Sequence, residues 1–234
     1  MLANRKLRTT MTLGAALLVI IGKLPITIAE AASPAAATSL APSDIDAGSS
    51  HLLAAAEPFE ALTEMAFSSL GLQLKRAIIA ADAAAKGARG SLPEASLAPL
   101  DARLSQIHEA YKSDDRAGLA ISSVEVYRIL VSAAHPGKVP TAVNLMDYAG
   151  FRYDADFKAK PIRWQDMKEV AAYAREQWAS ISDKIADRAL KETVDTALTD
   201  MELGAAQQNT FKARRSVNSE LRVVDELEKY FSKR

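Results

Sequence analysis

Apolar side chains recur at alternating steps of three and four residues between positions 164 and 185, and this spacing restricts the fold more than any other feature. It is typical of a helix that buries one seam in a bundle. The seam consists of Trp164, Met167, Ala171, Ala174, Trp178, Ile181 and Ile185. Similar stripes run along residues 59–77, 100–111 and 190–204, and no stretch alternates convincingly with period two, as a half-buried strand would.

We therefore expect an all-α fold, an up-and-down antiparallel bundle of four main helices in a single domain over residues 57–234. A short fifth helix near 141–155 is expected to connect the second and third main helices. The frequent alanines favour helix, because alanine loses no side-chain entropy there. Residues 207–218 are mostly polar where the last seam should continue, which indicates either a local change of supercoil or emergence from the bundle.

The N-terminus has the pattern of a secretory signal peptide over residues 1–31. Arg5, Lys6 and Arg8 precede a short apolar run, and small residues follow at Ala29 and Ala31. An uncleaved membrane anchor is the rival interpretation, but Lys23 limits the run to about a dozen residues, and a spanning helix needs roughly 20. We expect a periplasmic or secreted protein, with no stable membrane span after cleavage.

Residues 32–56 are rich in alanine, serine and proline and show no sustained period, so we expect a flexible leader before the folded domain. Without residues 1–31 the chain keeps 25 basic and 28 acidic residues, a net charge near −3. This balance provides no electrostatic footprint for nucleic acid. The chain contains no cysteine, which excludes disulfides, thiol nucleophiles and cysteine-ligated metals.

No catalytic motif is found in the sequence. It contains no G-x-S-x-G nucleophile elbow, no glycine-rich phosphate loop and no H-E-x-x-H or Glu-x-x-His metal pattern. A haem held between methionine and histidine could use Met65, but the last helix has no histidine to complete the pair. We predict no cofactor and a non-catalytic protein, while an enzyme of unrecognised type remains the second alternative.

Carboxylates at four positions keep open a divalent metal site, the first alternative. Glu64, Glu125, Asp147 and Glu202 would form it if their helices brought them together in the bundle. A simpler interpretation exists for Glu125, because Arg128 follows it at the i,i+3 spacing of a surface ion pair.

The preferred interpretation is a protein that binds a protein partner or a small ligand in the periplasm, as an accessory factor or sensor. Asp147 and Tyr148 project from the short connecting helix, with His135 nearby at the end of the preceding helix. A second polar group, Gln208 and Arg215, lies where the last seam fails. Those two residues either line a pocket or extend past shorter neighbours into water.

Overall fold

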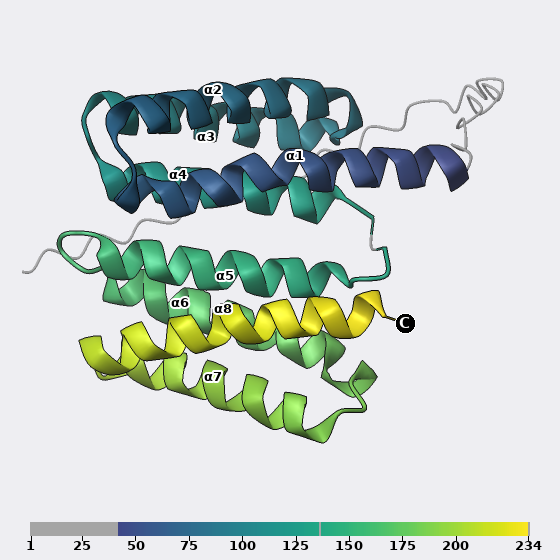
Figure 1. Ribbon diagram of the computed structural model, residues 1–234, viewed down its shortest axis with the longest axis vertical. Helices are drawn as coiled ribbons and strands as arrows, with labels where there is room; N and C mark the ends of the chain where they lie inside the picture. Colours follow the sequence, from purple (N-terminus) through teal and green to yellow (C-terminus); the bar gives the residue numbers. More distant parts are fainter. Residues whose placement is uncertain (1–41, 136, 234) are drawn as a thin grey trace, which may run out of the picture. The chain divides into compact units, whose positions relative to one another are not determined.

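The computed structural model describes residues 42–135 and 137–233, and every regular element in this part of the chain is helical. The helices alternate in direction along the chain (Figure 1). They are α1 (Pro42–Ser68), α2 (Gly71–Ala88), α3 (Glu94–Lys112), α4 (Arg116–Ala133), α5 (Thr141–Lys158), α6 (Trp164–Ile181), α7 (Arg188–Ala206) and α8 (Thr210–Ser232), with short 3₁₀ turns η1 (Arg89–Ser91) and η2 (Ser182–Lys184). The predicted all-α class is confirmed for these residues.

The helices pack as two groups that meet along α4 and α5. In the first group α1 packs against both α2 and α4, and α3 packs against α4. In the second group α5, α6, α7 and α8 pack in a ring of neighbours. Figure 1 shows the first group above the second, with α4 and α5 facing each other between them.

The expected arrangement of four main helices and one short helix is not confirmed, since residues 42–135 and 137–233 form eight α-helices. The helix near 141–155 is a full 18-residue helix, with ten buried residues that include Met146 and Tyr153. The region expected to form the first helix divides at Leu70, whose backbone is extended. Because Leu74 follows Leu70 at a helical step of four, the apolar stripe continues across the break and hides it.

Helix α1 also begins earlier than expected, within the segment predicted to be a flexible leader. Residues 42–56 are helical, and Leu52, Ala55 and Ala56 are at most 4% exposed. The leader boundary at 56 is therefore wrong. The physical reason is a stripe with steps of three and four that continues upstream of the expected helix: Leu52, Ala55, Phe59, Leu62 and Ala66. The predicted signal peptide and residues 32–41 lie outside the described part of the chain.

Two polar stretches of the sequence separate consecutive helices. The stretch at 113–118 separates α3 from α4, and Asp115 caps α4 by accepting a hydrogen bond from the Gly118 N–H at 2.8 Å. The polar stretch at 207–218 is neither a supercoil change nor a projection past the bundle. It begins with a tight turn in which Gln208 takes a positive φ and Asn209 caps α8. Helix α8 then returns alongside α7.

Helices α7 and α8 cross closely at Gly204. A methyl group there would lie 2.9 Å from the backbone nitrogen of Ala213 and 3.2 Å from the hydroxyl of Tyr153. We expect Gly204→Ala to lower the free energy of unfolding by about 1–3 kcal/mol, measured by denaturant unfolding, because backbone must shift to admit the methyl. Gly90→Ala, with no atom within 4 Å of the added methyl, is the control and should change it by less than about 0.5 kcal/mol. Equal effects would contradict this account.

Within the described residues, no helix combines the length and apolar character required to cross a membrane.

Candidate functional site

Helix α4 carries polar side chains into the contact between the two groups of helices. All residues from Leu119 to Tyr127 are buried, so Glu125 and Tyr127 stand among apolar neighbours. Because they are two positions apart on a helix, their side chains point about 160° apart. Each meets α5 at a different place, and the α4–α5 contact therefore holds two separate polar clusters.

The first is an arginine cluster formed by Glu125, Arg128, Tyr148, Arg152 and Asp156. The Glu125 carboxylate accepts hydrogen bonds from the Tyr148 hydroxyl at 2.7 Å, from Arg152 Nη1 at 2.6 Å and from Arg128 Nη2 at 2.9 Å. Arg152 also donates through Nε to Asp156 at 2.9 Å. The Asp156 side chain is completely buried, and that of Glu125 is 5% exposed.

The electrostatics of this cluster hold Glu125 in its charged form. Burial alone would raise the pKa of Glu125, but the Tyr148 hydrogen bond and the arginine charges outweigh it and leave the pKa below its usual value. At Asp156 burial dominates over the attraction of Arg152 and raises the pKa to about 6. The cluster therefore joins α4 to α5 through oppositely charged side chains. Both oxygens of the Glu125 carboxylate accept hydrogen bonds from protein donors.

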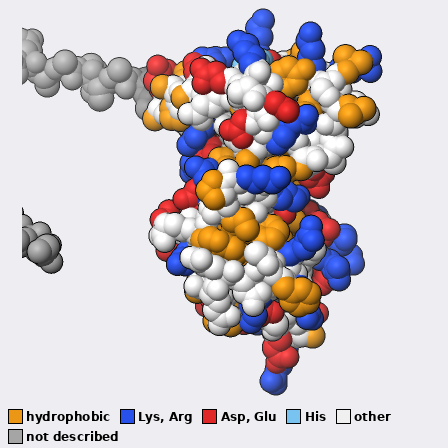
Figure 2. All heavy atoms as spheres, turned by 90° about the vertical axis from the view of Figure 1, so that its left-hand side faces the viewer, with side chains coloured by type: hydrophobic (Ala, Val, Ile, Leu, Met, Phe, Trp, Pro, Cys, Tyr) orange, Lys and Arg blue, Asp and Glu red, His pale blue; other side chains and the backbone are white. Residues whose placement is uncertain are grey.

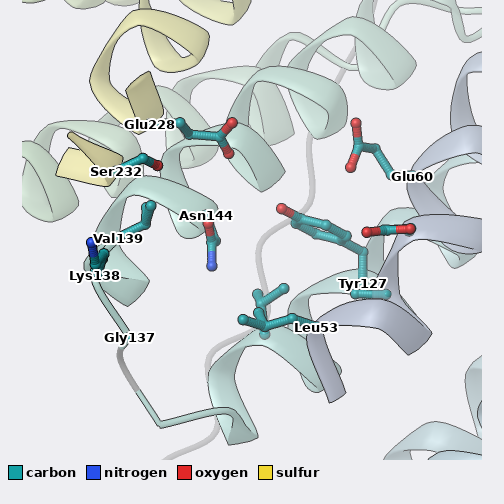
Figure 3. A pocket seen from close by; sticks show the side chains of 12 residues that line it. Leu53, Glu60, Tyr127, Gly137, Lys138, Val139, Asn144, Glu228 and Ser232 are labelled. Carbon is teal, nitrogen blue, oxygen red and sulfur yellow. The ribbon is translucent and has the colours of Figure 1, made fainter. Parts of the chain in front are cut away.

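The second cluster, which contains Tyr127, borders a cavity of about 450 Å³ between the two groups of helices. We call this cavity the acidic pocket. Helices α1, α4, α5 and α8 and the loop before α5 contribute its walls (Figure 3). The lining residues are Leu53, Ala56, Glu57, Glu60, Tyr127, Val131, Gly137, Lys138, Val139, Asn144, Glu228 and Ser232. Glu60 and Tyr127 lie on one side of the cavity in Figure 3, and Glu228, Ser232 and Lys138 lie on the other.

The carboxylates of this pocket repel one another. Burial, followed by the nearby charges of Glu64 and Glu228, raises the pKa of Glu60 to about 7. Burial and the charge of Asp225 raise the pKa of Glu228, with Lys229 acting in the opposite direction. Among the described residues, no ion pair involves Glu57, Glu60 or Glu228. Lys138 is the one basic residue in the lining and lies across the cavity from Glu60.

Two further acids lie behind the pocket wall. Asp147 on α5 accepts a hydrogen bond from the Tyr127 hydroxyl at 3.1 Å, and burial together with Glu60 and Glu228 raises its pKa well above the usual value. Glu220 on α8 is completely buried, and neither carboxylate oxygen has a hydrogen-bond partner in the described structure. Burial and the charge of Asp147 raise the pKa of Glu220 strongly. Glu220 packs against Gly150, and a methyl group there would displace the side chains of Glu220 and Leu221.

The structure separates the residues predicted to bind a ligand. Asp147 lies behind the acidic pocket and Tyr148 belongs to the arginine cluster, because successive side chains on a helix point about 100° apart. His135 is exposed at the end of α4, and its backbone N–H donates to Ser49 Oγ at 2.9 Å. Gln208 and Arg215 are exposed at the start of α8. Arg215 lies about 20 Å along that helix from Glu228, which borders the acidic pocket near the other end of the helix.

The four carboxylates of the predicted metal site are also engaged in different places. Glu125 lies among arginines, Asp147 bonds to Tyr127, and Glu202 pairs with Arg175 at 3.0 Å on the surface of α6 and α7. Glu64 is exposed on α1, one turn from Glu60. In the part of the chain that the structure describes, no group of three or more histidine, cysteine, aspartate or glutamate side chains is placed to hold a metal ion.

Comparison with protein-family models, curated proteins and solved structures finds no significant match to this chain. The site must therefore be interpreted from its own residues. Neither Glu228 nor Tyr127 was among the residues predicted to bind a ligand or a metal. The spacing of Asp225 and Glu228 within an amphipathic helix resembles any solvated face, so only the tertiary packing of α8 identifies Glu228 as a pocket residue.

Proposed function

We propose that this is an exported, non-catalytic binding protein whose acidic pocket takes a small organic cation, a protonated amine with an apolar portion. The observation that carries the proposal is that Glu57, Glu60 and Glu228, from two different groups of helices, border one cavity without an ion pair of their own. Export is proposed from the N-terminal pattern of residues 1–31.

The chemistry of the lining favours an amine. A protonated amine between Glu60 and Glu228 would offset their repulsion and donate charge-assisted hydrogen bonds, which are the stronger kind. Leu53, Val131 and Val139 offer apolar contacts to the rest of the molecule. Asn144 adds a neutral donor and acceptor. The volume of about 450 Å³ suits a compound of a few carbons.

The test is thermal denaturation and isothermal titration calorimetry with n-butylamine and 1,4-diaminobutane, and with n-butanol as a neutral compound of similar size. At a hundredfold excess over Kd, an amine that binds only the native state should stabilise it by about 2.7 kcal/mol, a rise in Tm of about 5–10 °C. Affinity should be about tenfold higher at pH 8 than at pH 5.5. Glu60, whose pKa is about 7, loses its charge over that interval while the amine keeps its own.

Glu60→Gln and Glu228→Gln should each weaken amine binding at pH 8 at least tenfold. Glu109→Gln, which removes an exposed acid of α3 outside the pocket, should leave it unchanged. The proposal fails if n-butanol binds as well as n-butylamine, or if Glu60→Gln has no effect. A Tm increase with Mn²⁺, Zn²⁺ or Ca²⁺ and none with amines would instead favour the metal-binding alternative.

A further inference from the structure

Helix α2 lies at the outside of the first group and exposes large apolar side chains. It packs mainly against α1 and only slightly against α3. Leu70, immediately before α2, is 76% exposed, Leu72 is 63% exposed and Ile79 is 59% exposed. These are three of the five large hydrophobic residues exposed in the described chain.

Basic residues share this face with the apolar ones. At 100° per residue, Leu72, Lys75, Arg76, Ile79, Ala83 and Lys86 fall within about 60° of one line along α2, and all six are exposed. We call them, with Leu70, the α2 face. No ion pair within the described residues involves Lys75, Arg76 or Lys86. Figure 2 views the end of the molecule from which α2 starts, and hydrophobic and basic side chains adjoin along its upper edge.

Acidic side chains are absent from the α2 face. The single acid of α2, Asp82, lies to one side and contacts His108 of α3 at 3.1 Å. The face is therefore locally positive on a chain whose expected mature form is net negative. Positive charge interleaved with separate large apolar side chains is the composition that binds the interfacial region of an anionic bilayer.

We propose that the α2 face docks onto an anionic lipid membrane surface, with Leu70, Leu72 and Ile79 entering the headgroup region and Lys75, Arg76 and Lys86 contacting lipid phosphates. An acidic protein partner is less suited to this face. Its 18 residues span about 27 Å, so a strip about 10 Å wide offers on the order of 300 Å². A standard protein interface needs about 800 Å² per partner with matching shape, whereas a fluid bilayer accepts single side chains.

The absence of cysteine allows a direct test in the full chain. Ala83→Cys on the α2 face and Ala179→Cys on the exposed face of α6 each accept one environment-sensitive fluorophore, such as NBD. Vesicles of phosphatidylcholine with about 30% phosphatidylglycerol should raise NBD emission severalfold at position 83 and leave it unchanged at 179. Vesicles of phosphatidylcholine alone should give little response. Because the probe reports local burial, binding through residues 1–31 would not by itself produce this pattern.

Variants in the Ala83→Cys background separate the two contributions. Leu70→Ser, Leu72→Ser and Ile79→Ser together should weaken vesicle binding at least tenfold. Each of Lys75→Gln, Arg76→Gln and Lys86→Gln should weaken it about fivefold, and more strongly at low salt. The combined Phe211→Ser, Arg214→Gln and Arg215→Gln variant removes an exposed aromatic and two cations from α8 and should bind normally.

The proposal is overturned if position 83 does not respond to anionic vesicles, or if the α8 variant weakens the response as much as the α2 variants. It is also overturned if soluble poly-glutamate raises NBD emission at position 83 as strongly as vesicles do and the three serine substitutions leave vesicle binding unchanged. That result would identify an acidic macromolecule as the partner. Circular dichroism and Tm confirm that each variant is folded.

Discussion

Replacing Arg152 by methionine is expected to lower the free energy of unfolding by about 3–5 kcal/mol. Arg152 is 16% exposed and donates to both Glu125 and Asp156, whose side chains are 5% and 0% exposed. Methionine keeps the apolar stem but leaves Asp156 with only a distant cation, Arg163 at 3.6 Å. A buried carboxylate that loses its partner costs far more than the pair contributed when intact, because its desolvation is no longer compensated.

The matched control is Arg175→Met. Arg175 also contacts two carboxylates, Asp195 and Glu202, but all three side chains are between 31% and 57% exposed. Its loss should cost less than about 1 kcal/mol, because solvent screens such pairs. Urea unfolding at pH 7 measures both variants. Equal losses of unfolding free energy in the two variants would show that burial does not determine the contribution of the arginine cluster. A loss below about 1 kcal/mol for Arg152→Met would contradict the claim that this cluster stabilises the contact between α4 and α5.

Replacing Glu220 by glutamine is expected to stabilise the protein by on the order of 3 kcal/mol at pH 8 and to change little at pH 4. Burial raises the pKa of Glu220 in the folded state above its value in the unfolded chain. The folded state therefore binds the proton more tightly, so the free energy of unfolding falls as pH rises above the unfolded value. Glutamine has nearly the same shape and cannot ionise, which removes this loss.

Glu220→Met gives a second measurement at the same position. Neither oxygen of Glu220 has a hydrogen-bond partner in the described structure, so removing both polar atoms should raise the free energy of unfolding by about 1–3 kcal/mol above that of Glu220→Gln at every pH. Chemical denaturation of the three proteins between pH 4 and 8 provides the comparison. A wild-type pH slope unchanged in Glu220→Gln would show that another acid, such as Asp147, controls it.

Periodicity predicted the helical class. It did not predict the number of helices. An apolar stripe continues through the break at Leu70, so the hairpin of α1 and α2 has nearly the same pattern as one long helix. The stripe does fail near Gln208, but that polar stretch predicted a change of supercoil or emergence from the bundle and not a turn. Helix breaks without proline depend on tertiary packing, which a single stripe does not encode.

The site was less accessible from the sequence than the fold. Asp147 and Tyr148 were predicted to project together toward a ligand, but Asp147 bonds to Tyr127 and Tyr148 bonds to Glu125, so the two serve different clusters. Glu125 was weighed as a metal ligand or a partner of Arg128, and Arg128 does bond to it at 2.9 Å. The additional contact from Arg152, and the approach of Glu228 to Glu60, depend on helices far apart in the chain, and periodicity within one helix contains no information about them.

The composition of the acidic pocket has a consequence for the order of folding. Glu60 and Glu228 are 168 positions apart in the sequence, so a chain emerging from its N-terminus can complete α1 to α4 long before α8 exists. Contacts at such separation form late, because a large loop must close before they stabilise anything. Shortened chains that end before α8 would keep the packing of the first group and lack one wall of the cavity. Binding of the proposed amine would therefore require that α8 has been synthesised and has packed against α5.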